Sequence, residues 1–282
     1  MGSLDGVLVA DLSRHLPGPF ASRELLRLGA RVVKIEPPPG DPMKAAAPSW
    51  YEELNRGKEI ITLDAAPELV ARADVVIEGF RPGVFERLNL TVRDDAVLCS
   101  ITGFGIGGPR EQQAGHDLNY LGYAGVLADT APALPPIQIA DLASGAQTAV
   151  IEILAALLAG GGARIVVSMT DASHRFVAHR LAGDPLPRLL TGGVACYRIY
   201  ETADGRFVTV AALEPKFWRR LCELIERPDF SDRAFDAELP ELAALFKTRT
   251  LTEWLALLER EETCVGPVLS LSEAAGSSPR SR

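Results

Sequence analysis

The N-terminal residues follow a strand–helix–strand pattern, which restricts the fold more than any other feature of the chain. An apolar run at residues 6–12 (GVLVADL) is typical of a buried strand, and residues 20–28 have helical spacing that ends at Gly29. A second apolar run follows at residues 31–35 (RVVKI). Two strands joined by one helix form a βαβ unit, which implies parallel strands and a right-handed crossover.

The same alternation continues through the first 182 residues. Further strand-like runs occupy residues 60–63, 74–78, 97–102 and 164–169. A long helix rich in Ala, Leu and Ile is predicted after Asp141, and another helix from residue 171. The alternation predicts an α/β fold whose large domain contains a Rossmann-like, doubly wound parallel sheet.

The glycine fingerprint of dinucleotide-binding folds is absent after the first strand. SRHLPGPF stands where GxGxxG is expected, so nicotinamide or flavin binding is not predicted. Another Gly-rich segment, at residues 103–109, follows a strand but does not open a periodic helix. We interpret it as a tight turn, including Gly105, that lets the backbone approach another group closely.

The chain changes character after the predicted large domain, 1–182. Two prolines mark a linker at 183–192, and residues 193–275 predict a small α+β domain. This domain begins with a hairpin at 196–213 that turns at an Ala-Asp-Gly sequence, and helices are predicted at 215–226, 239–246 and 251–262. The last residues, 276–282 (GSSPRSR), are predicted to form a disordered tail.

Composition excludes several classes of partner. The net charge of −8 and the lack of a basic block argue against nucleic acid and anionic membranes. The four cysteines are widely spaced without a metal-binding pattern, so no metal is expected. No uninterrupted apolar run spans a bilayer and no signal peptide is recognised, so a cytoplasmic location is expected.

Three acid–base residues are candidates for chemistry. His116 lies in a polar loop, Asp141 stands where the N-cap of the long helix is expected, and Glu214 precedes a proline that begins a helix. An imidazole, a carboxylate and the free amides at the helix start could move a proton and stabilise negative charge. Taken singly, Asp141 could be an ordinary cap and Glu214 an acid that complements the helix dipole.

Four cations stand at strand ends or turns on the expected ligand-binding edge of the sheet. They are Lys34, Arg56, Lys58 and Arg81. Such a group would suit phosphates, although each cation could equally be a solvated surface residue.

Read together, the segments resemble the class III CoA-transferase family (the CaiB/BaiF type), and within it the α-methylacyl-CoA racemases. The matching stretches span nearly the whole chain in order; they include LDGVLVADLSRHLPGPFASRELLRLGARVVKIEPPPGD, LNRGKEIITLD, ADVVIEGFRPGVFERL, AGHDLNY, PPIQIADLASGAQ, YRIYETADGRFVTVAALEPKFW and CVGPVLSLSEA. AGHDLNY and the EP of the small domain are the racemase-like features.

The resemblance implies roles for the candidate residues. Asp141 matches the family's catalytic aspartate, His116 the opposing base of the racemases, and Glu214 an acid partner from the small domain. The acyl-CoA site should involve the segment from Asn55 to Lys58, with Arg81, and Tyr120 of the AGHDLNY motif is a further candidate contact. Coenzyme A then belongs to the substrate, and no separate cofactor is implied.

Three functions are weighed. The first is epimerisation of 2-methylacyl-CoA thioesters by proton transfer through an enolate. The second is transfer of CoA between carboxylic acids with Asp141 as nucleophile. The third is an inactive acyl-CoA-binding relative. The resemblance also implies a homodimer; family chains continue past CVGPVLSLSEA back to the large domain, so interlocking of the subunits is left open.

Overall fold

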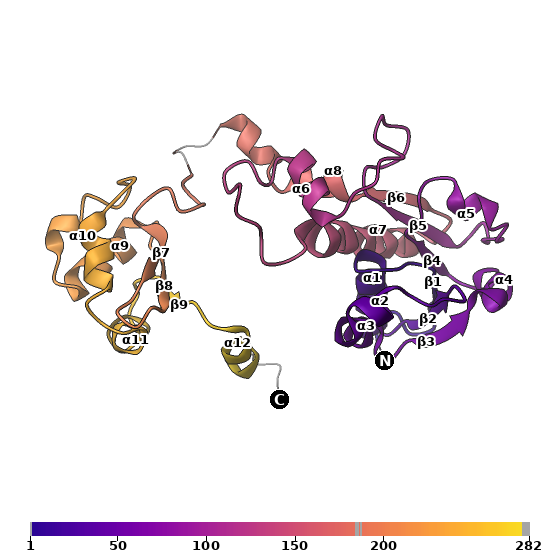
Figure 1. Ribbon diagram of the computed structural model, residues 1–282, viewed down its shortest axis with the longest axis horizontal. Coiled ribbons are helices and arrows are strands. Elements are labelled where there is room, and N and C mark those ends of the chain that lie inside the picture. Colours follow the sequence, from indigo (N-terminus) through magenta and orange to yellow (C-terminus); the bar gives the residue numbers. More distant parts are fainter. Residues whose placement is uncertain (1, 184–185, 187, 278–282) are drawn as a thin grey trace. The chain divides into compact units, whose positions relative to one another are not determined.

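The computed structural model describes residues 2–183, 186 and 188–277. The chain divides into two compact units, Met1–Leu181 and Ala182–Arg282, and each has its own sheet and core (Figure 1). Part of the predicted linker, at 184, 185 and 187, lies outside the described residues. The same holds for 278–282 of the predicted tail, whereas Gly276 and Ser277 belong to helix α12.

The large unit contains the predicted parallel sheet. Its six strands lie in the order β3-β2-β1-β4-β5-β6, and every neighbouring pair is parallel. The strands are β1 Leu8–Asp11, β2 Arg31–Glu36, β3 Glu59–Thr62, β4 Val75–Glu78, β5 Val97–Thr102 and β6 Arg164–Ser168. The order reverses between β1 and β4, which creates the crevice where ligands bind in open α/β sheets.

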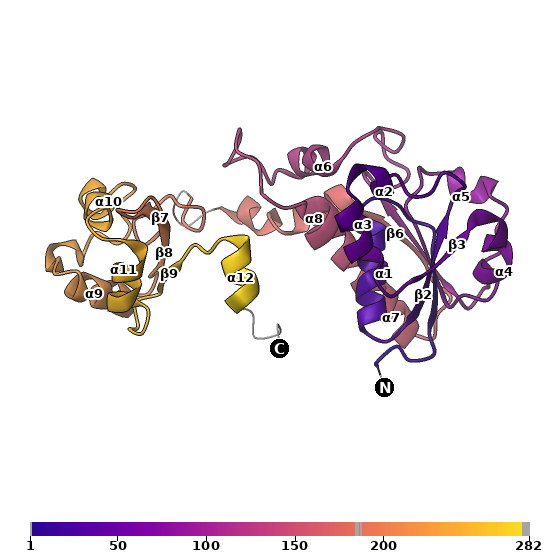
Figure 2. The ribbon, with the colours of Figure 1, turned by 60° about the horizontal axis from the view of Figure 1, so that its bottom comes forward.

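Helices cover both faces of this sheet. Figure 2 shows α1 and α7 on one face, with α4 and α5 on the other. The helices are α1 Pro17–Arg27, α2 Met43–Ala46, α3 Pro48–Asn55, α4 Ala66–Val70, α5 Val84–Arg87, α6 Asp117–Ala124, α7 Gln147–Leu158 and α8 Met169–Arg175, with a π-helix at Ile139–Ala146 that runs directly into α7. Short 3₁₀ turns occur at Leu63–Ala65 and Ala178–Ala182.

Side-chain alternation along the strands builds two cores. In β4, Val75 and Ile77 belong to the cluster beneath α1 and α7, whereas Val76 belongs to the cluster beneath α4 and α5. Because both faces are buried, these strands have continuous apolar sequences and little polar alternation. The doubly wound α/β architecture predicted from the sequence is therefore confirmed.

The combined helix Ile139–Leu158 has 20 residues with a mean hydropathy of 1.4, so by length and composition it could cross a membrane. This differs from the expectation drawn from the sequence, which considered only uninterrupted apolar runs. Asp141 and Glu152 interrupt the apolar sequence of this helix. One face of the helix, with Ala149, Val150 and Ile153, packs into the core of the large unit. The core helix of a globular unit passes the same test, so the finding is weak evidence for a membrane span.

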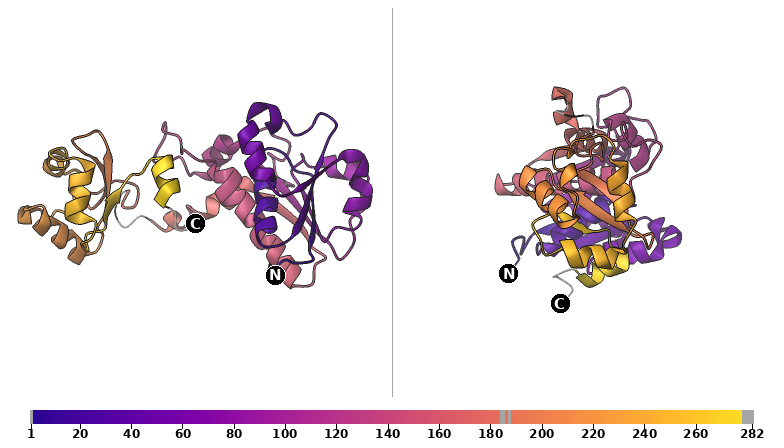
Figure 3. Two further views of the ribbon diagram at one scale, coloured as in Figure 1. Left: turned by 90° about the horizontal axis from the view of Figure 1, so that it is seen from below. Right: turned by 90° about the vertical axis from the view of Figure 1, so that its left-hand side faces the viewer.

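The small unit is built on an antiparallel sheet in the order β7-β8-β9. The predicted hairpin is present, and Figure 3 shows helices packed on one side of it. The elements are β7 Tyr197–Glu201, β8 Phe207–Ala211, α9 Pro215–Leu224, a 3₁₀ turn Pro228–Phe230, α10 Pro240–Phe246, α11 Leu251–Leu258, β9 Val265–Pro267 and α12 Leu271–Ser277. Trp218 and Trp254 are buried in its core and donate to the carbonyl oxygens of Phe230 and Phe246, each at 2.8 Å.

Candidate active site

A cavity of about 480 Å³ opens in the large unit at the point where the strand order reverses. Its walls come from the segments that follow β1, β4 and β5, from the segment before α6, and from the start of the π-helix. The side chains with polar or charged groups that line it are Ser13, Arg14, His15, Arg81, Thr102, Glu111, Gln113, His116, Asn119, Tyr120 and Asp141. His116 and Asp141 are therefore brought to one cavity from separate segments, together with Arg81 and Tyr120.

His116 is positioned by the start of helix α6. The residue is the N-cap of that helix, with an extended backbone (φ −130°, ψ 177°), and its N–H donates to Oδ1 of Asn119 at 3.0 Å. The sequence placed His116 in a loop and did not predict α6, because AGHDLNY contains too few apolar residues for a helical period. The cap fixes the backbone from which the imidazole extends, and the side chain remains accessible to solvent.

Asp141 is not an N-cap, which corrects the sequence prediction. The helix begins two residues earlier in π geometry, with Gln138 as its cap residue, so Asp141 lies in the first turn. A π-turn is wider than an α-turn and does not follow the 3.6-residue period, so the apolar pattern predicted a later start. Gly145 permits the turn, since a Cβ there would lie 2.5 Å from Cγ of Met169 and 2.9 Å from the Ala140 carbonyl oxygen.

Two of the amides at the helix start, where a free oxyanion site was expected, are engaged. The N–H of Leu142 donates to the carbonyl oxygen of Gln138 at 3.0 Å, and the N–H of Asp141 donates to Oδ1 of Asp117 at 2.9 Å. The prediction failed because Asp117, the neighbour of His116, already occupies the start of the π-helix. Asp117 thereby ties α6 to this helix, and it brings the segments that carry His116 and Asp141 together.

The environment of the cavity raises the pKa of two of its side chains, Asp141 and Tyr120. Burial, followed by the negative charge of Asp117, raises the pKa of Asp141 from 3.8 to about 7. Burial and the charge of Asp141 raise the pKa of Tyr120 to about 12, although Arg81 acts in the opposite direction. Asp141 can therefore exchange a proton near neutral pH, as general acid–base catalysis requires.

Tyr120 is held against the glycine-rich turn. Its hydroxyl donates to the carbonyl oxygen of Gly115, and a Cβ at Gly103 would lie 2.4 Å from its ring. The close approach predicted for this turn thus occurs at Gly103. Gly105 instead supplies a left-handed backbone (φ +78°), donates its N–H to Thr102 Oγ1 at 3.0 Å, and is not among the residues that line the cavity.

Lys34 and Lys58 do not face a ligand, which corrects the predicted cluster of four cations. Lys34 Nζ lies 2.9 Å from the Ser13 carbonyl oxygen and 3.0 Å from Asp41 Oδ2, and its side chain is fully buried. Lys58 is also fully buried and donates to the Pro19 carbonyl oxygen at 2.8 Å. Their position at strand ends was predicted. Both ammonium groups are instead paired with buried carboxylates, because an unpaired buried carboxylate is energetically costly.

Asp11, at the end of β1, is the centre of this buried network. Burial alone would raise its pKa, but Lys58, Lys34 and the hydroxyls of Ser13 and Ser22 bring it below its ordinary value. Burial in turn lowers the pKa of Lys58 to about 8. The network fixes the segment between β1 and α1, which forms one wall of the cavity.

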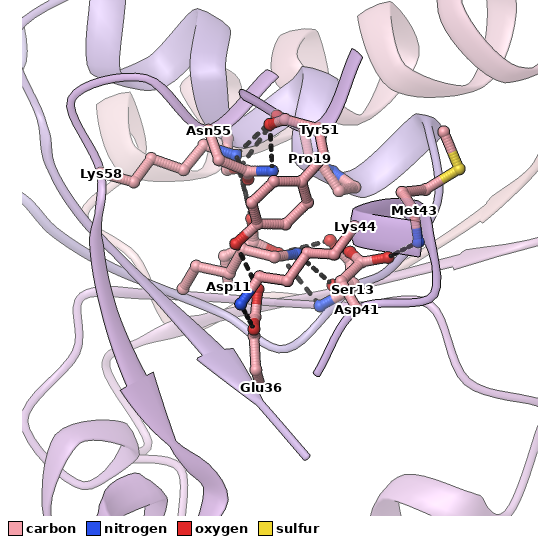
Figure 4. A network of polar contacts seen from close by, with 12 residues as sticks. Asp11, Ser13, Pro19, Glu36, Asp41, Met43, Lys44, Tyr51, Asn55 and Lys58 are labelled. Carbon is pink, nitrogen blue, oxygen red and sulfur yellow. Dashed lines mark hydrogen bonds and ion pairs between the residues drawn. The ribbon is translucent and has the colours of Figure 1, made fainter. Parts of the chain in front are cut away.

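The remaining predicted site residues lie elsewhere. Asn55 is buried and accepts a hydrogen bond from Lys58 Nζ at 2.9 Å, so it belongs to the same network (Figure 4). Arg56 is exposed and pairs with Glu53 at 2.8 Å. Glu214 is the exposed N-cap residue of α9 in the small unit, and its role in the reaction stays a prediction.

Sequence reasoning missed His15 and Arg14. Both line the cavity, and Arg14 stands over the Phe80 ring with its Cζ 5.9 Å from the ring centroid. Burial lowers the pKa of His15, Asp41 opposes this change, and Arg14 and His116 reinforce it. The signal was available, since SRHLPGPF places a histidine between a strand end and a helix start at the expected binding edge. As for metals, no group of three or more His, Cys, Asp or Glu that could hold an ion occurs among the described residues.

Comparison of the sequence with known proteins finds one matching family and relatives that cover most of the chain. The model of CoA-transferase family III matches residues 4–280. The chain is 32% identical to the α-methylacyl-CoA racemase of Mus musculus, over 96% of this chain and 79% of the relative. It is 31% identical to the acetyl-CoA:oxalate CoA-transferase of Acetobacter aceti, over 97% of this chain and 82% of the relative.

Solved structures agree with these sequences. A crystal structure of a CaiB/BaiF family protein from Brucella suis matches with a TM-score of 0.82 and 26% identity, covering 99% of this chain and 87% of that chain. A hypothetical protein from Mycobacterium tuberculosis matches with a TM-score of 0.83 and 27% identity, covering 99% and 87%. Because the family model matches nearly the whole chain, and the sequence relatives and these structures agree with it, the chain belongs to CoA-transferase family III.

Proposed function

We propose that the chain epimerises 2-methylacyl-CoA thioesters by removing the α-proton and returning it to the other face of the same carbon. The observation that carries this proposal is the placement of His116 and Asp141 on one cavity. The relatives include both racemases and CoA transferases, so the choice between the two reactions depends on this pair.

The chemistry needs one proton carrier on each face of the α-carbon. A proton next to a thioester carbonyl is weakly acidic, and a base near neutral pKa removes it most effectively. His116 supplies to the cavity an imidazole, the side chain that most often serves as a general acid or base. Asp141, with a pKa of about 7, can hold the proton that the enolate takes up. The same pair works in reverse, which makes epimerisation a two-way reaction.

Arg81 is proposed to bind the CoA part of the substrate. It is exposed, it lines the cavity, and it follows β4 at the edge where phosphate-bearing ligands bind in doubly wound folds. Binding energy from CoA would then hold the acyl group between the two proton carriers and lower the barrier at the α-carbon. Arg56, which is exposed on the same unit, remains a second proposed contact.

The test is exchange of the α-hydrogen in deuterated buffer. Purified chain with a 2-methylacyl-CoA and no free carboxylic acid should incorporate deuterium and produce both enantiomers. His116→Gln should lower the rate of conversion of one enantiomer into the other by about 10²-fold or more, since that conversion needs both proton carriers. The exposed His179, which is not among the cavity residues, offers a matched control as His179→Gln.

A transferase would behave differently. It would require a carboxylic acid acceptor, would form a covalent CoA adduct on Asp141, and would tolerate His116→Gln. Failure of the wild-type chain to exchange any 2-methylacyl-CoA, together with CoA transfer to an added acid, would contradict the proposal.

A further inference from the structure

His15 is the cavity residue that the proposed proton transfer does not use. It lies between β1 and α1 and lines the same cavity as His116 and Asp141. Its φ of +66° is in the left-handed region, which is uncommon for a residue other than glycine. Backbone outliers of this kind concentrate at active sites, where the surrounding structure enforces them.

The segment that carries His15 is held rigidly on both sides. The N–H of Ser13 donates to Oδ1 of Asp11 at 3.0 Å, inside the buried network described above. Gly18 approaches Ser13 so closely that a Cβ there would lie 2.0 Å from its hydroxyl oxygen. These contacts fix the backbone on either side of His15, and a supported backbone is one part of the preorganisation that a catalytic hydrogen-bond donor needs.

The surroundings of His15 favour its uncharged form, although the side chain is exposed. Partial burial lowers its pKa, and the charges of Arg14, His116 and Lys34 act in the same direction against the opposing effect of Asp41. An uncharged imidazole carries one N–H donor and one acceptor nitrogen, so it can donate a hydrogen bond and keep its proton.

The proposed reaction requires such a donor. When the α-proton leaves, negative charge develops on the thioester carbonyl oxygen, and fixed donors stabilise it there. The amides of Asp141 and Leu142 are engaged, and the hydroxyl of Tyr120 donates to Gly115. The imidazole of His15 lines the cavity on the segment after β1, and no hydrogen bond to its ring occurs among those recorded for the described residues.

We propose that His15 is a further catalytic residue, which donates a hydrogen bond from its imidazole N–H to the carbonyl oxygen of the acyl thioester. The inference rests on the proposed function, because that oxygen belongs to the substrate that His116 and Asp141 would deprotonate. The electron pair of the broken C–H bond becomes the C=C bond of the enolate, the π pair of the carbonyl group moves to its oxygen, and the α-proton goes to His116 or Asp141. The ring proton stays on His15 throughout, and the hydrogen bond shortens as the oxygen becomes negative.

The test compares His15→Leu, which has no donor, with His15→Gln, which keeps one. His15→Leu should lower kcat for α-hydrogen exchange by about 10²-fold while KM changes little, the usual loss for one oxyanion donor. His15→Gln should recover part of kcat. His179→Leu is the matched control for the loss of an exposed histidine. If His15→Leu fails to fold, His15→Asn suits the left-handed backbone but is too short to keep the donor in place, and it should lose kcat in the same way.

A second readout needs no turnover. The carbonyl stretching frequency of a bound, ¹³C-labelled 2-methylacyl-CoA should be lower in the wild-type chain than in His15→Leu, because a hydrogen bond weakens the C=O bond. Equal frequencies, or a kcat of His15→Leu within twofold of wild type, would overturn the role of His15. A wild-type chain that shows the frequency difference but no exchange would remove the proposed epimerisation and leave the hydrogen bond from His15 standing. No binding of the thioester by the wild-type chain would overturn both.

Discussion

The carboxyl group of Asp141 is held in an environment that favours its protonated form. Burial and the neighbouring Asp117 raise its pKa from the ordinary value of 3.8 to about 7. The sequence identified the residue but not this property, because Asp117 reaches Asp141 only through the contact between α6 and the π-helix. The identity of a catalytic residue can thus be read from a motif, whereas its acidity depends on tertiary neighbours.

This acidity predicts how Asp141→Asn changes stability with pH. The native state binds the Asp141 proton more tightly than the unfolded state, so Asp141 lowers the free energy of unfolding progressively as the pH rises from about 4 to about 7. Removing the charge should therefore stabilise the large unit at pH 8 by at most about 4 kcal/mol, and hardly at all near pH 3.5. Denaturant titrations at the two pH values measure the difference.

The exposed Asp94 provides the control, as Asp94→Asn in the same unit. It removes a carboxylate that is exposed, so it measures the effect of an Asp→Asn change without the burial that surrounds Asp141. A stabilisation by Asp141→Asn that is the same at pH 3.5 and pH 8 would contradict the assignment of a raised pKa.

Among the elements, the strands were predicted most accurately. Strand β5 has the bounds expected from its apolar run, Val97–Thr102. The starts of helices were harder to predict. The π-turn before α7 shifts the phase of the apolar pattern, and the sequence of α6 has almost no apolar periodicity. The inward direction of Lys34 could not be predicted either, because alternation is hidden where both faces of a strand are buried. Lys58 precedes β3, so strand alternation says nothing about its direction.

The π-helix predicts a specific sensitivity at Gly145. A Cβ at this position would overlap Met169 and the Ala140 carbonyl oxygen, so Gly145→Ala should force the first turn to move. We expect a loss of about 1–3 kcal/mol in the free energy of unfolding, typical of overpacking, and a lower kcat because Asp141 lies in that turn. Thermal denaturation and the exchange assay measure the two effects.

Gly122 in helix α6 is the matched control. A Cβ there would meet no atom within 4 Å, so Gly122→Ala should stabilise the helix by about 0.5–1 kcal/mol through its higher propensity. If Gly145→Ala is as well tolerated as Gly122→Ala, the packing of the π-turn is not as described.

At the scale of the molecule, the chain consists of two units with separate hydrophobic cores. Each core is formed by residues from its own unit. The sequence predicted this division from the linker prolines and the hairpin that follows them. It could not predict the short β9, because the three residues Val265–Pro267 carry no alternating pattern and include a proline.

Separate cores predict separate unfolding transitions. The buried tryptophans Trp218 and Trp254 belong to the small unit, whereas Trp50 of the large unit is 53% exposed. Tryptophan fluorescence should therefore follow the small unit, and circular dichroism should follow both. Added CoA should raise the transition of the large unit and leave the tryptophan transition unchanged, because a ligand stabilises the unit that binds it. Coincident transitions that shift together would contradict this view.

The central claim is that His116 and Asp141 serve opposite faces of one α-carbon. The most direct measurement is the initial rate of α-deuterium incorporation from each pure enantiomer of a 2-methylacyl-CoA, for the wild-type chain, His116→Gln and Asp141→Asn. We predict that each variant loses proton abstraction from one enantiomer, that the two variants lose opposite enantiomers, and that the wild-type chain accepts both. Loss of the same enantiomer in both variants, or exchange that survives both substitutions, would contradict the account.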